Sequence, residues 1–371
     1  MPANTLNRPG RGARLATLIL TVIVAGTLAH AHSISVLAST VPSNGDVNPY
    51  GVAVVPTTMG SLVQGNILVS NFNNSSNLQG TGTTIVEISP SGSFSLFAQI
   101  DPNHLPGSCP GGIGLTTALV ALKTGWVIVG SLPTTDGTAA TAQAGCLLVL
   151  DSSGNVVETF FGSLINGPWD MTAADGGNHV SLFVTNVLNG TVAGGGKVVN
   201  QGTVLRLNLF MAKGTIPSLQ SMTIIGSGFA ERTDPAALVI GPTGVGLSSD
   251  DGLDGEDGHQ VLYVADSLNN RIAAISNPLT RSSSGGTGTT VTKGGSLNDP
   301  LGLIVANGDI ITVNGNDGFA VGTTPDGHQA AKVLLDSSGN PPGAGALFGL
   351  AAVGQKLYFV DDAENDLKLF Q

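Results

Sequence analysis

Short runs of apolar residues recur along this chain, and each run is bounded by Gly, Pro, Asn, Asp or Ser. Six times, a Pro/Gly turn leads into a small apolar run, and a second apolar run follows 12 to 22 residues later. The first runs are NPYGV (48–52), GGIGL (111–115), GPWDM (167–171), GPTGV (241–245), DPLGL (299–303) and ALFGL (346–350). The second runs are ILVSN (67–71), VIVGS (127–131), LFVTN (182–186), LYVAD (262–266), IITVN (310–314) and LYFVD (357–361). Apolar and β-branched runs of this length, closed by turn residues, predict strands.

Each repeat contains four such strand-like runs. In the first repeat they are Gly51–Val55, Gly65–Ser70, Thr83–Ser89 and Ser93–Gln99, and a Ser-Pro-Ser-Gly turn at 89–92 joins the last two. Repeats of 47 to 74 residues built from short strands indicate a solenoid or a propeller.

The two ends of the chain distinguish these architectures. The sixth repeat stops after Leu367–Phe370 and lacks a fourth strand, whereas an orphan strand, Ser33–Ala38, precedes the first repeat. A blade shared by both termini leaves no sheet edge open, whereas a straight solenoid needs capping repeats. The sequence therefore predicts an all-β, closed six-bladed β-propeller with four-stranded antiparallel blades, in which the N-terminal strand completes the last blade.

The strand order assigns the loops to the two faces of the ring. The longest irregular segments connect second to third strands: Asn71–Gly82, Ser131–Gly145 and Asn186–Gly202. The links Ile100–Gly112 and Phe229–Gly241 are expected on the same face. We call this the long-loop face. Since loops on a rigid scaffold commonly carry function, it is the predicted working surface.

Composition narrows the class of protein further. Of 371 residues, 53 are Gly, which suits many tight turns, and 41% are apolar, which argues against disorder. Only 11% are charged, with a formal net charge of −11. A chain this acidic has no electrostatic route to nucleic acid or anionic lipid, because both require clustered Lys and Arg.

The N-terminus predicts export. Three arginines precede an apolar run, Leu15–Ala29, which is short for a membrane span but suits a signal peptide. Small residues at Ala29 and Ala31 place cleavage before His32, although an uncleaved anchor is an alternative. We expect a signal peptide at 1–31 and one propeller domain at 32–371, located outside the cell or in the periplasm or cell envelope.

The two cysteines both fall in the second repeat. Cys109 precedes its first strand and Cys146 begins its third, and in an antiparallel blade these points lie on one face. Export permits a disulfide, so we predict a Cys109–Cys146 bridge with a structural role; two free thiols are the alternative.

Three segments resemble the NHL repeat: Leu262–Ile272, Leu297–Leu303 and, more weakly, Phe348–Asp361. The resemblance covers the whole predicted mature chain as a pattern and is close in the fourth to sixth repeats. It implies a six-bladed ring. NHL-like propellers include protein-binding, RNA-binding, lyase and lactonase members, so the resemblance implies the fold and leaves the function open.

The resemblance also implies a role for the residue that ends each second strand. In NHL-like propellers this Asp or Asn holds the following turn through its side chain. The matching residues here are Asn71, Asn186, Asp266, Asn314 and Asp361, and Ser131 departs from the pattern.

The same five residues are candidate binding residues at the channel mouth. Hard cations such as Ca²⁺ prefer several oxygen ligands, and lactonase-type propellers use Glu, Asn and Asp in this way. Their metal-binding Glu has no match, because Glu87 falls on a third strand. We therefore expect no cofactor, with Ca²⁺ or another divalent cation as the alternative.

Asp170 is the most unusual single position. The repeat pattern places Gly at the equivalent position of the other five repeats. A carboxylate bordering the channel could bind a cation or act as a base, with Trp169 and Tyr50 as neighbouring ligand-binding residues. The alternative is that Asp170 caps nearby backbone N–H groups.

Other motifs add little chemistry. The acidic stretch Asp250–Gly258 fails the spacing of a calcium loop and predicts a solvated turn. Histidines are few, and no nucleophile elbow or phosphate loop occurs. The leading hypothesis is a secreted, monomeric, non-catalytic binding module whose partner is an extracellular protein, peptide or glycan. The alternative is a metal-dependent, lactonase-like hydrolase or lyase at the channel mouth.

Overall fold

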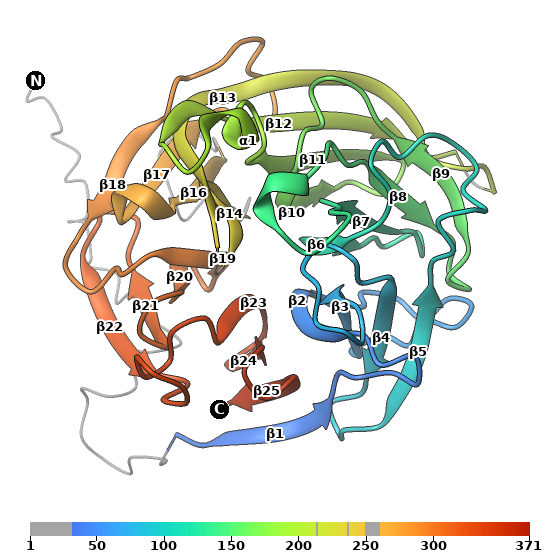
Figure 1. Cartoon of the computed structure of the whole chain (residues 1–371), viewed down its shortest axis with the longest axis horizontal. Helices are drawn as coiled ribbons and strands as arrows, with labels where there is room; N and C mark the ends of the chain where they lie inside the picture. Colours follow the sequence, from blue (N-terminus) through green and yellow to red (C-terminus); the bar gives the residue numbers. More distant parts are fainter. Residues whose placement is uncertain (1–31, 213, 236, 249–259) are drawn as a thin grey trace, which may run out of the picture.

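A computed structural model describes residues 32–212, 214–235, 237–248 and 260–371. Six antiparallel sheets surround a central axis like blades, so the chain is an all-β, six-bladed propeller (Figure 1). The predicted signal peptide and the acidic stretch Asp250–Gly258 lie outside the described residues. No helix in the described ranges is long and apolar enough to cross a membrane.

Each blade is a meander that starts at the channel and ends at the rim. From the inside outward, the blades are β2 (Val47–Val54), β3 (Ile67–Asn73), β4 (Thr84–Ile88), β5 (Phe94–Gln99); β6 (Leu115–Ala121), β7 (Val127–Ser131), β8 (Leu147–Leu150), β9 (Val156–Phe160); β10 (Pro168–Asp175), β11 (His179–Asn186), β12 (Val199–Phe210), β13 (Ser218–Asp234); β15 (Pro242–Leu247), β16 (Val261–Asp266), β17 (Arg271–Ser276), β18 (Thr289–Lys293); β19 (Pro300–Ala306), β20 (Asp309–Asn314), β21 (Phe319–Thr323), β22 (Gln329–Leu334); and β23 (Leu347–Val353), β24 (Lys356–Asp361), β25 (Asp366–Phe370), β1 (Ile34–Ser39).

The ring closes as predicted. β1 pairs antiparallel with β25, from Ile34 opposite Phe370 to Ser39 opposite Asp366. Backbone bonds between Ser33 and Gln371 extend this pairing at 2.9 and 3.1 Å. Both termini of the propeller therefore share its last blade (Figure 1).

Recurrent glycines allow the inner strands to approach one another. A Cβ on Gly302 would lie 2.0 Å from the carbonyl oxygen of Phe348, and a Cβ on Gly349 would lie 2.0 Å from that of Tyr50. Any side chain at these positions would push neighbouring blades apart, since real Cβ contacts are never this short. This steric requirement explains why Gly follows Pro-x or Leu-x at the start of most repeats. Between the blades, apolar side chains from adjacent sheets interdigitate to form the core.

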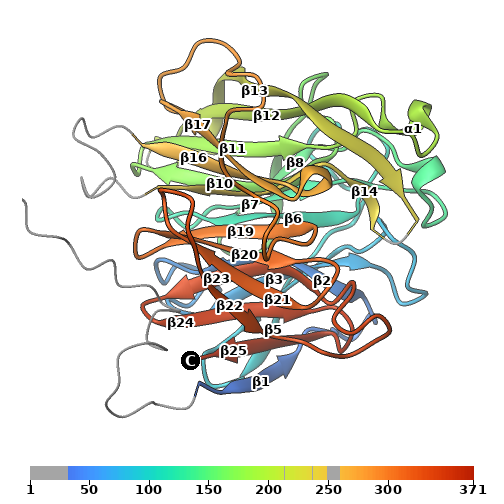
Figure 2. The same ribbon diagram turned by 90° about the vertical axis from the view of Figure 1, so that its left-hand side faces the viewer.

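The third blade departs from the prediction. The segment Phe229–Gly241 was expected to be an irregular link, but β13 continues to Asp234 and folds back as β14 (Leu238–Ile240). Three consecutive apolar side chains in β14 are buried, and this burial stabilises the hairpin. The hairpin lies inside the ring in Figure 1 and on the same side as helix α1 (Thr191–Gly194) in Figure 2.

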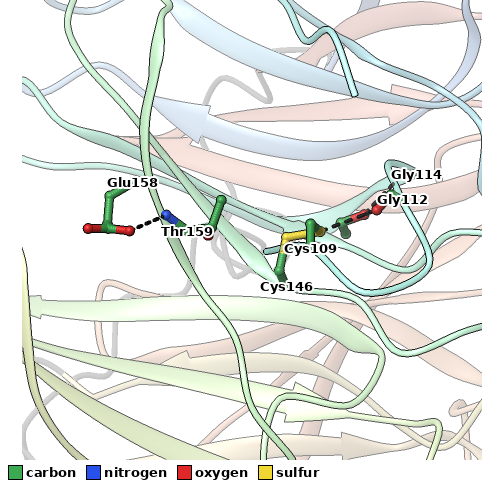
Figure 3. Close-up of a disulfide and its surroundings, with 7 residues drawn as sticks. Cys109, Gly112, Gly114, Cys146, Glu158 and Thr159 are labelled. Atoms are coloured by element: carbon green, nitrogen blue, oxygen red, sulfur yellow. Dashed lines mark hydrogen bonds between the residues drawn. A yellow bond between two sulfur atoms is a disulfide. The ribbon is translucent and has the colours of Figure 1, made fainter. Parts of the chain in front are cut away.

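The predicted disulfide is present. Cys109, in the link before β6, is bonded to Cys146, which directly precedes β8 (Figure 3). The Cys109 sulfur also lies 3.2 Å from the carbonyl oxygen of Gly112. The bridge fastens the link between the first two blades to the long loop of the second blade.

Candidate functional site

A cavity of about 490 Å³ occupies the central channel. All six inner strands contribute to its wall, and its mouth lies among the hairpins that join first to second strands. The mouth residues include Pro56, Lys123, Asp175, Asn307 and Gly354. The cavity therefore opens on the face opposite the long loops.

The other end of the channel is closed by apolar side chains. We call this group the plug; it consists of Tyr50, Phe72, Trp169, Leu238, Leu301 and Phe348, and each is 5% exposed or less. The Tyr50 ring stacks on Phe72 and on Phe348, with centroids 4.5 and 4.0 Å apart. Only a void of about 10 Å³ remains among these side chains, so the channel does not pass through the ring.

Two predicted binding residues, Tyr50 and Trp169, belong to the plug. Each is 4% exposed, and both rings pack in the core. Burial and the nearby Asp362 carboxylate raise the pKa of the Tyr50 hydroxyl. Burial likewise raises the pKa of Asp362 to about 7. A ligand-binding role for Tyr50 and Trp169 stays a prediction.

Asp170 lies where the cavity meets the plug. Its carboxylate accepts the N–H of Met171 at 2.8 Å and, from the next blade, the N–H of Val245 at 2.9 Å. Burial raises its pKa to about 7, and the two N–H groups oppose that rise. Asp170 thus caps backbone groups, as the alternative reading proposed, while also lining the cavity.

The second blade requires a correction. The pairing of Leu115 with Ser131 and of Leu119 with Val129 leaves three residues in a bulge opposite Gly130. The position equivalent to Asp170 therefore falls in this bulge, at Thr117 rather than at Gly114. Gly occupies the position in four of the other blades instead of five. The sequence comparison missed this because the second repeat has one extra residue and no Pro to mark its register.

Thr117 was not singled out from the sequence. It is 3% exposed, lines the cavity, and its hydroxyl oxygen has no hydrogen-bond partner. Buried hydroxyls are normally paired, so this one is an unused polar group beside the Asp170 cavity wall. The adjacent second and third blades are thus the two that place polar side chains where the others have Gly.

The rest of the cavity wall is largely apolar. Val52, Val54, Ile304 and Ala351 line it, and the lining contains no aromatic residue. Charge is confined to the mouth, apart from Asp170. There, the Asp175 carboxylate accepts the backbone N–H of Lys123 at 2.6 Å, and the Lys123 ammonium donates to the Asp175 carbonyl oxygen at 3.0 Å.

The five residues that end the second strands are buried inside their blades. Asn71, Asn186, Asp266, Asn314 and Asp361 are all 0 or 1% exposed. Asp266 bonds Asn269 and forms an ion pair with Arg271, and Asp361 contacts the Lys368 ammonium at 2.6 Å.

The three asparagines hold the segment that enters the blade. Asn71 donates to the Thr40 carbonyl, and Asn186 accepts the N–H of Asn166. Asn314 accepts the N–H of Asn298 and also reaches forward to Asp317. These contacts fit the turn-holding role that the resemblance implied, extended to the preceding link. Their predicted role in binding a ligand is not tested.

These residues do not fit a metal site at the long-loop end of the channel. Their oxygens are engaged within separate blades, and the plug lies between them. Across the described ranges, no group of three or more His, Cys, Asp or Glu is arranged to hold a metal ion.

The long loops form one connected cap over the first three blades. Thr134 donates its N–H to the Gly80 carbonyl and its hydroxyl to the Gln79 carbonyl, at 2.9 and 2.5 Å, which joins the first two loops. The 3₁₀ turn η2 (Ala139–Thr141) of the second loop contacts α1 of the third. The three loops therefore behave as a single packed layer rather than as separate flexible segments.

The outer surface of this cap is uncharged over most of its area. Its exposed residues are mainly small and polar, and Asp136 and Lys197 are the fully exposed charged groups of the three loops. No aromatic ring is exposed in them. The larger exposed apolar side chains are Leu78 and Val198, at 37% and 53%.

A scan against models of known protein families finds no match to this sequence. A search of curated proteins finds none either. Solved structures, however, share its architecture. Regucalcin from Agrobacterium tumefaciens, a calcium-binding protein, superposes with a TM-score of 0.55 at 13% identity, over 90% of this chain and 92% of that one.

Two further structures are similar over most of their length. The PQQ-bound aldose sugar dehydrogenase from Streptomyces coelicolor has a TM-score of 0.52 at 16% identity, over 92% of this chain and 98% of that one. A putative glucose dehydrogenase from Thermus thermophilus has a TM-score of 0.53 at 12% identity, over 92% and 100%. At these identities the likeness supports the propeller fold alone, and NHL-repeat membership stays a resemblance.

Proposed function

We propose that this protein is an exported, monomeric, non-catalytic binding module, and that its long-loop face meets a protein or peptide partner. The observation that carries the proposal is the connected cap of loops above a channel closed by the plug. A closed, broad and packed surface suits contact with a polypeptide, whereas small substrates are usually held in concave pockets.

The chemistry of the cap favours a polypeptide over a glycan. Sugar rings are commonly bound by stacking on exposed aromatic side chains, and the three loops present none. They present hydroxyl, amide and backbone groups together with Leu78 and Val198. Such a surface can exchange hydrogen bonds with a peptide backbone and cover its apolar side chains.

Export draws support from two independent features. The N-terminal sequence has the basic, apolar and small-residue order of a signal peptide. The Cys109–Cys146 bond is of a kind that persists in oxidising compartments. We place the protein outside the cytoplasm, either released or within the cell envelope.

A peptide-display selection tests the proposal. Peptides enriched on the wild-type protein are measured against the double variant Leu78→Asp/Val198→Asp, which places two charges on the cap. A matched control, Phe94→Asp/Leu334→Asp, changes two exposed apolar residues on strands β5 and β22. We expect the cap variant to weaken binding by at least about tenfold and the control to leave it unchanged. Equal binding to both variants, or no enrichment, would overturn the proposal.

The metal-dependent hydrolase or lyase remains a separate hypothesis with one observation in its favour. Asp170 borders a cavity and has a pKa of about 7, a property common in general bases. This hypothesis expects stoichiometric metal in the purified protein, a melting temperature lowered by EDTA, and activity lost in Asp170→Ala.

A further inference from the structure

The open cavity has a use that the long-loop face does not explain. It lies on the opposite face of the ring and is separated from the cap by the plug. Its volume of about 490 Å³ falls within the range typical of small-molecule sites. Any ligand must enter from the hairpin side, between Lys123 and Asn307, because the other end is closed.

The inner end of the cavity carries a carboxylate with unused capacity. An ionised carboxylate offers about four lone-pair positions, and Asp170 uses two of them for the N–H groups of Met171 and Val245. No basic side chain lines the cavity near it; Lys123 is at the mouth and is engaged with Asp175. The carboxylate therefore lacks a counter-charge.

A second polar group at the same depth also lacks a partner. The buried Thr117 hydroxyl makes no hydrogen bond, although it lines the cavity. Leaving a buried hydroxyl unpaired costs on the order of 1–3 kcal/mol. A ligand that donated hydrogen bonds to both Asp170 and Thr117 would remove that cost and neutralise the carboxylate.

We propose that the channel cavity binds a small organic amine, with its ammonium group between Asp170 and Thr117 and its apolar body along Val52, Val54 and Ile304. An ammonium has three donors and one positive charge, which matches two acceptors and one carboxylate. The apolar wall matches an aliphatic or aromatic body. Sugars fit poorly because the wall offers few polar groups, and anions are repelled by Asp170 and by the net charge of −11.

Calorimetric titration with hexylamine tests this assignment, with 1-hexanol as the uncharged analogue of equal length. We expect hexylamine to bind at least about tenfold more tightly than hexanol, since a charge-assisted hydrogen bond contributes this much. The same titration is made on Asp170→Asn, Thr117→Val and, as a matched control, Asp101→Asn, whose carboxyl is exposed in the link before β6. The first two variants should weaken hexylamine binding and the control should not.

Several outcomes would overturn the assignment. Among them are no hexylamine binding at about 10 mM, equal binding of hexanol, and unchanged affinity in both Asp170→Asn and Thr117→Val. Displacement of hexylamine by Ca²⁺ at an equal concentration would assign the carboxylate to a cation site instead. Thr117→Val is nearly isosteric, so it keeps the test decisive if Asp170→Asn does not fold. None of these outcomes depends on the long-loop face or its partner.

Discussion

The Asp170 carboxylate accepts the backbone N–H of Val245 at 2.9 Å, and so joins the inner strands of the third and fourth blades through a side chain. Elsewhere in the ring the equivalent position is Gly, because backbone atoms of the next blade leave no room for a Cβ; at Gly244 that Cβ would lie 2.3 Å from the N–H nitrogen of Leu303. The third blade thus replaces close backbone packing with a buried ionisable group. This exchange makes the stability of the ring depend on pH.

We predict that Asp170 makes the protein less stable as the pH rises from 4 to 8. Its folded pKa of about 7 lies above the ordinary value of 3.8, so the folded state holds the proton more tightly than the unfolded state. The stabilising contribution is complete below pH 4 and is lost as the pH passes through 7. Urea denaturation should reveal a loss on the order of 2 kcal/mol attributable to this group.

The variant Asp170→Asn isolates that contribution. Asparagine keeps the shape but does not titrate, so the difference in unfolding free energy between wild type and variant should change with pH between 4 and 8. Asp101→Asn, in an exposed link, is the control and should leave the pH dependence unaltered. A pH-independent difference between wild type and Asp170→Asn would mean that the carboxyl has an ordinary pKa.

A second buried carboxyl, Glu231, should act at higher pH. It lies on β13 near Thr191 of α1, it is 0% exposed, and burial raises its pKa to about 8. The same sign applies: stability is lost as the pH rises through 8, because ionisation is unfavourable only in the folded state. We expect Glu231→Gln to be on the order of 2 kcal/mol more stable than wild type at pH 9 and equal to it at pH 4.

Thermal denaturation at both pH values measures this effect. Glu87→Gln serves as a matched control, since Glu87 is also buried but accepts hydrogen bonds from Val63 and Asn66. Its replacement should destabilise the protein at pH 9, because a partnered carboxylate is lost. If Glu231→Gln were destabilising at pH 9 as well, Glu231 would have to be ionised and paired in the folded state.

The fold could be predicted because its signals are local and repeated. Alternating strands and turns recur six times, and the pairing of the chain ends followed from a missing strand near Phe370 and a spare one near Ile34. Cys109 and Cys146 were paired correctly because strand order alone brings them to one face. None of these inferences required knowledge of how side chains pack.

The site was less predictable because it depends on register and packing. A single extra residue in the second blade hid Thr117, and the repeat pattern pointed to Gly114 instead. Tyr50 and Trp169 are aromatic residues at a channel mouth, which in sequence suggests ligand stacking. Their burial depends on the β13–β14 hairpin, whose Leu238 packs with them, and no repeat-based pattern contains that hairpin.

Removing the disulfide should loosen the second blade and leave the rest of the ring folded. The Cys109–Cys146 bridge closes a segment with a sequence separation of 37 residues. Limiting the freedom of a loop this long in the unfolded chain contributes about 3 kcal/mol. We therefore expect Cys109→Ser/Cys146→Ser to lose roughly that much stability in urea denaturation.

Limited proteolysis shows where the loosening occurs. In the double variant, new cleavage should appear in the link 100–112 and the loop 132–145, which the bridge joins. The loop 74–83 of the first blade is the internal control, and its cleavage should not precede that of the other two. Uniform cleavage across all blades would show that the bridge stabilises the whole ring rather than one blade.

Ring closure by β1 should be essential for stability, whereas the position of the chain termini should not. Deleting residues 33–39 exposes the edge of β25 and uncovers the buried side chains of Leu369 and Phe370. Exposing two large apolar side chains alone costs at least about 3 kcal/mol, and an open edge promotes association between molecules. Ser33 and Gln371 are hydrogen-bonded to each other, so an Asn-Gly turn can join them. A circular permutant made this way, opened between Ser91 and Gly92 in the exposed turn before β5, keeps every blade complete. Urea denaturation and sedimentation should find the deletion destabilised and aggregated and the permutant close to wild type; a deletion variant as stable as the permutant would mean that the β1–β25 pairing does not hold the ring together.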